Sequence, residues 1–189
     1  MNLAAKHAYM PVDEYLQGEP KSAIRHEYIA GMVYAMAGAG EKHNRISLNI
    51  AFHLRAASRG KPCGVFINDM KLRIDDSDSF YYPDVMVTCD PTDTQSLFKK
   101  LPCLLVEVLS PSTETIDRRE KLLAYRKLPT LRHYLLVSQD QRWVQWHRRN
   151  EHGQWEVFDV QDQHTLQLTC PGIEANLSLD DIYEDVVMA

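Results

Sequence analysis

The chain has 189 residues, of which 44% are hydrophobic and 25% are charged, and its formal net charge is −5 at neutral pH. These proportions are ordinary for a globular domain and argue against a disordered chain or a membrane protein. The acidic balance argues against a protein that binds nucleic acid chiefly through bulk positive potential, although it leaves room for a local basic groove. We expect one domain over residues 1–189.

The N-terminal stretch lacks the long apolar core of a secretory signal, so we expect the protein to reside in the cytoplasm. Its four cysteines, Cys63, Cys89, Cys103 and Cys170, include no pair with the CxxC spacing typical of a zinc or redox motif. In a chain of this size we expect these thiols to be reduced and buried rather than bridged. Disulfides and zinc motifs therefore have no part in the expected fold.

The first third of the chain predicts a short helix, a hairpin and a longer helix. Pro11 opens the helix at 11–16, because proline fits a first turn that needs no backbone donor. Apolar residues flank Gly31 in the segment 26–38, which predicts two short strands joined by a turn. From 42 to 58, apolar positions lie among good helix formers, which predicts an amphipathic helix.

Three strands should follow, at 63–74, 81–89 and 103–110. After them we expect a helix at 114–128 and another buried strand at 133–138. The order of elements from residue 42 is therefore α, β, β, β, α, β. Beyond residue 138 apolar and polar residues alternate, which predicts antiparallel strands with one solvent-exposed face at 142–149, 154–160 and 164–170. A helical turn should follow at 178–187. The fold class is α/β or α+β with a mixed central sheet.

Two acidic residues stand out on the predicted strands. Glu107 lies within the apolar run 104–109, which indicates a strand buried on both faces, and Asp84 follows Pro83 at the start of the preceding strand. If these strands are neighbours, both carboxylates can lie on the same face at the same end of the sheet. Burying two like charges costs several kcal/mol, so the pair implies a cation, a shared proton, or a nearby lysine or arginine.

Two carboxylates with a backbone carbonyl and waters are a typical way to hold Mg²⁺. Such a metal polarises a phosphodiester and activates the attacking water, which indicates phosphodiester hydrolysis. A lysine would complete the site by orienting the water and offsetting negative charge. Position 109, two residues after Glu107, is a leucine. Lys121 on the following helix is therefore the first candidate, and Lys71 on the preceding strand is the second.

Each candidate also has a purely structural interpretation. Asp84 can serve as a turn acceptor after its proline, and Glu107 can be a paired structural acid. Lys121 can form a surface ion pair with Asp117, one helical turn earlier. Three further residues could line the same cavity or act only as structural hydrogen-bonding groups: Glu27, His43 and Asp69.

Five segments together resemble the Uma-type restriction endonuclease family, within the PD-(D/E)xK nuclease superfamily. They are HEYIAGMVYAMAG (26–38), HNRI (43–46), YYPDVMV (81–87), VEVLSPST (106–113) and DRREKLLAY (117–125). The resemblance runs from about Tyr9 to Tyr183 and rests on the order and spacing of all five segments. It implies a nuclease-like αβββαβ core, with an N-terminal hairpin and C-terminal antiparallel strands added.

The resemblance also implies that Asp84 and Glu107 bind a divalent metal, Mg²⁺ or Mn²⁺, and that Lys121 replaces the strand lysine of the superfamily signature. Leu109, at the signature position, is the departure from the pattern. DNA is the implied substrate, and we expect a homodimer with one active site for each strand. The hypothesis is a divalent-metal-dependent DNA endonuclease. The alternative is a nuclease-fold module that binds DNA or a protein without cleaving, and hydrolysis of RNA or another phosphodiester is a third interpretation.

Overall fold

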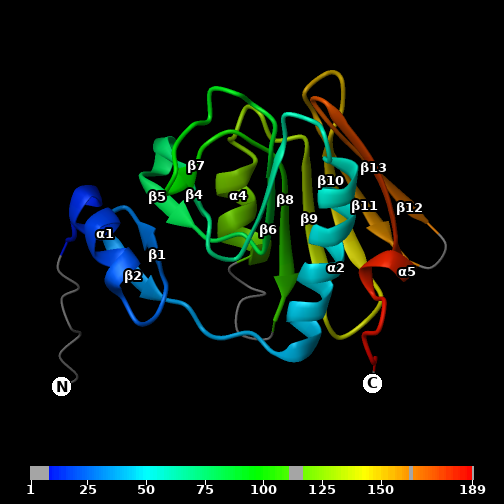
Figure 1. The fold of residues 1–189 in the computed structure, drawn as a ribbon, viewed down its shortest axis with the longest axis horizontal. Coiled ribbons are helices and arrows are strands. Elements are labelled where there is room, and N and C mark those ends of the chain that lie inside the picture. The colour runs from blue at the N-terminus through cyan, green and yellow to red at the C-terminus, as the bar shows by residue number, and fades with distance from the viewer. Residues whose placement is uncertain (1–8, 111–116, 162–163, 189) are drawn as a thin grey trace.

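The fold is a mixed α+β arrangement of two larger sheets and one hairpin (Figure 1). A computed structural model describes residues 9–110, 117–161 and 164–188. Its main sheet contains six strands, in the spatial order β11 (Trp155–Val160), β10 (Val144–Arg149), β9 (His133–Ser138), β8 (Pro102–Leu109), β6 (Val85–Thr88) and β3 (Gly64–Ile67). The sheet is mixed, because β8 and β9 pair in parallel and its other pairs are antiparallel.

The second sheet contains β2 (Met32–Ala35), β1 (His26–Ile29), β5 (Ser79–Tyr81), β4 (Lys71–Ile74) and β7 (Phe98–Lys99), in that order. It is also mixed, since only its β4–β7 pair is parallel. A separate hairpin consists of β12 (Thr165–Cys170) and β13 (Ile173–Ser178). Figure 1 shows the second sheet on the side of the N-terminus and the hairpin on the opposite side.

The described helical segments are α1 (Val12–Gly18), α2 (Glu41–Ala57), the π-helical segment η3 (Asp117–Lys121), α4 (Leu122–Tyr125), α5 (Leu179–Ile182) and two short 3-10 turns, η1 (Glu19–Lys21) and η2 (Asp75–Ser77). The predicted helix at 42–58 is confirmed as α2. The predicted helix at 114–128 is shorter where it is described, because regular helix ends at Tyr125, and residues 111–116 lie outside the described part. No helix in the described ranges is long and apolar enough to cross a membrane.

Among the described residues the core has three parts: one on each face of the main sheet, and a smaller aromatic cluster of Tyr15, Tyr28, Phe80 and Phe98 between α1 and the second sheet. On one face, α2 and the β12–β13 hairpin pack against the sheet, with Ile46, Ile50 and Leu54 fully buried. On the other face, Tyr125 of α4 and Leu72 of β4 pack among the sheet residues. The sheet is covered on both sides, which explains why β8 and β9 are so largely apolar.

Two predicted strands are each divided between the two sheets. The segment 63–74 contains β3 and β4, because Asn68 adopts a left-handed backbone conformation (φ 45°) and turns the chain out of the main sheet. The segment 81–89 is likewise divided at Pro83, which has no N–H to donate to a strand partner. Tyr81 therefore ends β5, and β6 begins at Val85.

The expectation of reduced, unbridged cysteines is wrong for this structure. It contains two disulfides, Cys63–Cys89 and Cys103–Cys170. The partners lie 26 and 67 residues apart in the sequence, and the pairing and packing of strands bring them together. Spacing rules for local motifs therefore could not detect them.

His133 is a buried histidine whose surroundings favour its neutral form. Its Nδ1 accepts a hydrogen bond from the indole N–H of Trp146 (3.1 Å), and its Nε2 lies 3.1 Å from the Thr169 carbonyl oxygen. A proton on Nδ1 would face the Trp146 donor. Burial lowers the pKa of His133 from 6.5 to about 4.

We expect His133 to make the free energy of unfolding depend on pH. Between pH 6.5 and about 4, His133 is protonated in the unfolded state but neutral in the folded state, because its folded pKa is lowered. Its contribution to the free energy of unfolding is therefore fully present above pH 6.5 and is lost as the pH falls through this range. The shift corresponds to about 3 kcal/mol. Urea unfolding at several pH values measures this effect. Between pH 7 and pH 4 the free energy of unfolding should fall by about 3 kcal/mol less in His133→Gln than in the wild type. Equal pH slopes for the two proteins would contradict the assignment.

Candidate active site

The two strand acids lie directly opposite each other. In the β6–β8 ladder Val85 pairs with Val106 and Met86 with Leu105, so extending the same register by one residue sets Asp84 opposite Glu107. Opposed residues of an antiparallel pair point to the same face of the sheet. Met86 and Leu105 belong to the core between the main sheet and α4, so both carboxylates are on that face.

Asp84 is held by the neighbouring strand and by α2. Its Oδ2 accepts a hydrogen bond from the backbone N–H of Val108 (2.7 Å) and lies 3.2 Å from Nε2 of His43. Pro83 explains why the acid is available, because it interrupts β-pairing immediately before Asp84 and lets the side chain turn to the strand end. The carboxylate therefore has a fixed orientation.

Glu107 is almost completely buried, with 3% of its surface exposed. Its Oε1 accepts a hydrogen bond from the Tyr125 hydroxyl (2.7 Å) and one from Nζ of Lys121 (3.3 Å). Burial, and after it the charge of Glu107, raises the pKa of Tyr125 well above its ordinary value. Tyr125 therefore stays a neutral donor that orients Glu107.

Lys121 reaches the site from the helix that follows β8. Its Nζ lies 3.3 Å from Oε1 of Glu107 and 3.0 Å from Oε1 of Glu27, which comes from β1 of the second sheet. Glu27 also accepts a hydrogen bond from the backbone N–H of Tyr82 (3.4 Å). One lysine thus contacts two carboxylates from two different sheets, and all three side chains are largely buried.

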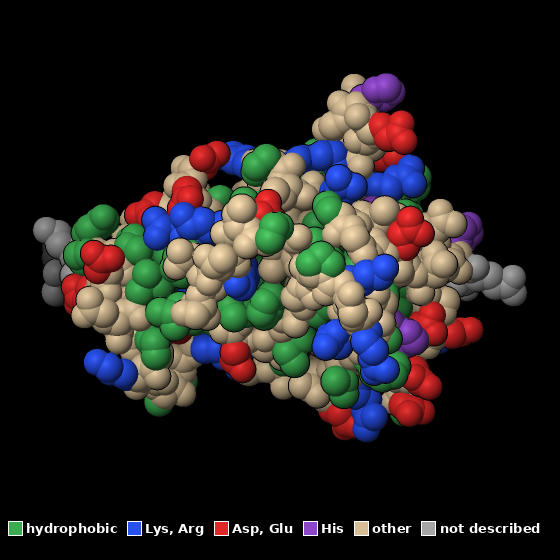
Figure 2. Space-filling view, turned by 45° about the horizontal axis from the view of Figure 1, so that its top comes forward, with side chains coloured by type: hydrophobic (Ala, Val, Ile, Leu, Met, Phe, Trp, Pro, Cys, Tyr) green, Lys and Arg blue, Asp and Glu red, His purple; other side chains and the backbone are tan. Residues whose placement is uncertain are grey.

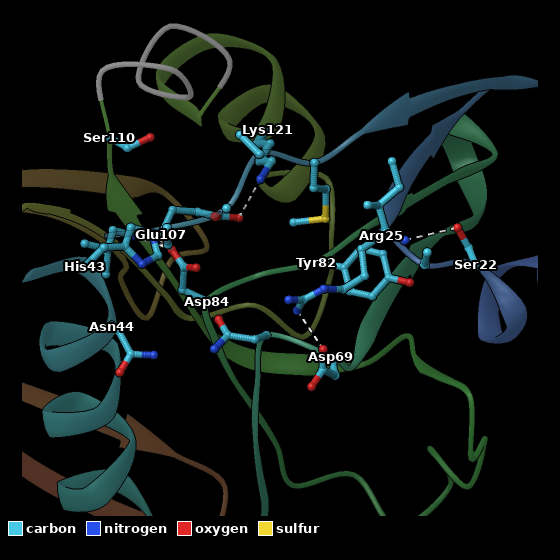
Figure 3. Close-up of a pocket in the computed structure, with 18 residues that line it drawn as sticks. Ser22, Arg25, His43, Asn44, Asp69, Tyr82, Asp84, Glu107, Ser110 and Lys121 are labelled. Atoms are coloured by element: carbon cyan, nitrogen blue, oxygen red, sulfur yellow. Dashed lines mark hydrogen bonds and ion pairs between the residues drawn. The ribbon is translucent and has the colours of Figure 1, made fainter. Parts of the chain in front are cut away.

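His43, Asp84, Glu107 and Lys121 lie at one side of a cavity of about 650 Å³. Figure 3 shows Asp84 and Glu107 next to each other, with His43 and Asn44 approaching from α2 and Lys121 from the segment before α4. Arg25, Tyr82 and Asp69 line the other side. The polar and charged side chains in the lining are Ser22, Arg25, His43, Asn44, Asn68, Asp69, Tyr82, Asp84, Glu107, Ser110 and Lys121.

The structure separates the two candidate lysines. Lys71 does not line this cavity; it lines a neighbouring one of about 270 Å³, and its Nζ lies 5.5 Å from the centre of the Tyr82 ring. Burial lowers the pKa of Lys71. Leu109, at the signature position for a lysine, is buried in the apolar core. Among the three positions, Lys121 is the one that the described residues place in contact with a strand acid.

Of the other sequence candidates, His43 and Asp69 line the cavity and Glu27 lies behind Lys121. Glu27 and His43 contact the central residues, whereas Asp69 forms an exposed ion pair with Arg25 (2.6 Å) at the other wall. The side chain of Asp117 lies outside the described part, so its pairing with Lys121 stays a prediction. Sequence reasoning missed Tyr125, although a tyrosine four residues after Lys121 falls on the same helical face.

The donor set fits a hard divalent cation. Three carboxylates, Asp84, Glu107 and Glu27, gather around one lysine and one histidine, so the site carries excess negative charge when His43 is neutral. Asp84 and Glu107 offer oxygen ligands, and Val108 lines the same cavity. Mg²⁺ and Mn²⁺ prefer oxygen ligands and often keep waters when two carboxylates bind them.

One family model matches most of the chain. The model of the Uma2 family, described as "Putative restriction endonuclease", matches residues 12–180. The chain therefore belongs to the Uma2 family. Two Synechocystis relatives are named "Uncharacterized protein slr1290", 38% identical over 90% of this chain and 90% of its own, and "Uncharacterized protein sll1609", 32% identical over 87% and 94%.

A solved structure has the same fold. It is titled as a putative nuclease belonging to DUF820 from Anabaena variabilis, and its TM-score is 0.77. The alignment covers 94% of this chain and 99% of that chain at 19% sequence identity. At this identity the likeness establishes the fold alone.

Proposed function

We propose that the protein is a divalent-metal-dependent DNA endonuclease that hydrolyses phosphodiester bonds. Asp84 and Glu107 would hold Mg²⁺ or Mn²⁺, and Lys121 would assist the attacking water. The observation that carries the proposal is the meeting of two acids on adjacent strands with a buried lysine in contact with one of them. The order α2, β3, β6, β8, α4, β9 supports a core of the PD-(D/E)xK type, with helix and strands in αβββαβ sequence.

The residues around the carboxylates have separate parts in this proposal. A bound metal would supply Lewis-acid activation of the phosphate and of the attacking water. The Val108 N–H and the Tyr125 hydroxyl fix the two carboxylates, so the ligands are preorganised. Lys121 places a positive charge beside the reacting phosphate and can hold the water by a hydrogen bond. His43 positions Asp84 from α2.

A non-cleaving module is the second candidate. Leu109 stands where the signature has a lysine, and Lys121 is held between two carboxylates rather than by one. Figure 2 shows Lys and Arg side chains interspersed with Asp and Glu on the face in view, not gathered in one basic field. Leu109 and the pairing of Lys121 favour a protein that does not cut DNA, and the mixed charges of this face favour a protein partner over DNA.

Cleavage and metal binding separate the two functions. The purified protein is incubated with supercoiled and linear DNA, with RNA and with a small diester, each with Mg²⁺, with Mn²⁺ and with chelator. We expect nicking or linearisation of DNA that depends on the metal. Calorimetric titration with Mn²⁺ should show a site that Asp84→Asn weakens about 10- to 100-fold or more. Absence of metal binding together with absence of cleavage would support the binding module.

Two further features belong to the proposal. We propose a homodimer, because two-fold symmetry would place one active site on each strand of the duplex. We also propose that the enzyme acts in the cytoplasm. Light scattering with and without a short DNA duplex measures the molar mass of the protein in solution. A stable monomer in both conditions would contradict the dimer.

A further inference from the structure

The four cysteines of the chain come together at one place away from the carboxylates. Cys63 precedes β3, Cys89 follows β6, Cys103 lies in β8 and Cys170 ends β12. The Sγ atoms of Cys89 and Cys103, which belong to different disulfides, are 3.9 Å apart. Those of Cys89, Cys103 and Cys170 all lie within 4.8 Å of one another, and Cys63 is bonded to Cys89. The chain has four cysteines in total, so every one of them is in this cluster.

Strand register explains why the cysteines meet. Gly64 pairs with Thr88, so the residues just outside that pair, Cys63 and Cys89, face each other. Thr88 pairs with Pro102 at an irregularity of the β6–β8 ladder, which brings Cys89 beside Cys103. The hairpin then adds Cys170 from the covering layer. Four segments that are far apart in the sequence thus each contribute one sulfur atom to the same cluster.

The sulfurs of Cys89 and Cys103, which belong to different disulfides, already have the spacing of a tetrahedral soft-metal site, whereas the two bonded pairs would have to separate. Thiolates bind Zn²⁺ at about 2.3 Å, so two sulfurs at the corners of a tetrahedron lie roughly 3.8 Å apart. The Cys89–Cys103 separation of 3.9 Å is close to this edge length. Three of the cysteines are buried in the apolar core, and Cys63 is partly exposed, which gives an ion a route to the cluster.

We propose that this cluster is a zinc site with four cysteine ligands when its two disulfides are reduced. A dithiol reductant gives two electrons and two protons to each disulfide, which becomes two thiols while the reductant becomes a disulfide. Binding of Zn²⁺ then releases the four thiol protons and leaves four thiolate ligands. The bridged form and the metal-bound form are two alternative ways of joining β3, β6, β8 and β12.

In the cytoplasm, where we propose that the protein acts, the redox conditions favour the metal-bound form. Disulfides persist in oxidising compartments, and thiols of cytosolic proteins are kept reduced. A reduced cluster of four cysteines in a mostly buried position offers the closed tetrahedral ligand set of structural zinc sites. Cys103 precedes Glu107 by four residues in β8, which is about 13 Å along a strand, so this zinc would be structural and separate from the carboxylate site.

The test uses the full chain, purified with a dithiol reductant present throughout. We expect mass spectrometry of the metal content to give one zinc ion per chain. Replacing zinc with Co²⁺ should produce thiolate-to-cobalt charge-transfer absorption in the near ultraviolet and the intense visible bands of a tetrahedral site. The cobalt spectrum is measured on the wild type, so it does not depend on the folding of any variant.

Variants locate the site. Cys89→Ser and Cys103→Ser should each remove or shift the charge-transfer band, whereas Asp84→Asn should leave it unchanged because the acid lies in the other site. Removing the metal from the reduced protein should lower the unfolding temperature by roughly 10 °C. The proposal is overturned if the reduced, folded wild type has four titratable thiols and no thiolate-to-cobalt band. It is also overturned if both disulfides remain intact under the reductant. Neither outcome bears on DNA cleavage, so this proposal and the nuclease proposal can fail separately.

Discussion

Asp84→Asn and Glu107→Gln are each expected to reduce metal-dependent DNA cleavage by about 10³-fold or more. Each change removes a charged ligand, and a catalytic metal supplies several kcal/mol of transition-state stabilisation. Both substitutions nearly preserve side-chain volume, so the packing around the pair at the β6–β8 strand ends should be kept. The measurement is the initial rate of plasmid nicking at saturating Mn²⁺.

The matched controls are acids on the surface. Asp76→Asn and Glu151→Gln make the same chemical changes at exposed positions outside the cavity and should cleave at the wild-type rate. Circular dichroism should show that all four variants are folded. Cleavage at the wild-type rate by both Asp84→Asn and Glu107→Gln would remove the two acids from the mechanism.

Lys121→Met should have the second large effect, on both activity and stability. The change leaves Glu107 and Glu27 without the cation that lies between them, and breaking a buried ion pair costs about 3–5 kcal/mol. Cleavage should fall by about 10² to 10³, the usual loss when one electrostatic contact to the transition state is removed. Chemical denaturation with and without Mn²⁺ measures the change in stability, and we expect the metal to restore part of the lost stability.

Lys71→Met is the control for Lys121→Met. Lys71 is also a buried lysine, but it lines a different cavity, so its replacement should leave the cleavage rate within a few-fold of the wild type. A large loss of activity in Lys71→Met with retained activity in Lys121→Met would reverse the assignment of the two lysines.

The sequence could predict the placement of the two acids because each stands out locally. Glu107 interrupts a run of apolar residues, and Pro83 marks the strand end at Asp84. Strand alternation then limits where the two side chains can point. The same local pattern could not reveal that the chain changes sheets at Asn68, since only three residues separate the apolar run of β3 from the alternating residues of β4.

The features that the sequence did not reveal depend on contacts between remote segments. Glu27 was considered only as a cavity residue, and nothing near it in the sequence indicates a contact with Lys121, which lies far along the chain. The cysteine cluster depends in the same way on pairings among β3, β6 and β8. The strand β13 was also not predicted, although it has a local signal. Its residues Ile173, Ala175 and Leu177 alternate with polar residues, and the structure buries them.

The contact between Glu27 and Lys121 makes the chemistry of the site depend on how the molecule is assembled. Glu27 belongs to β1 in the second sheet, whereas Glu107 belongs to the main sheet, and the same ammonium group bridges them. Partial detachment of the N-terminal layer would therefore remove the Glu27 contact of Lys121 while its contact with Glu107 stays within the main body of the fold. A partner that loosens or clamps that layer would change how Lys121 is held without touching Asp84 or Glu107.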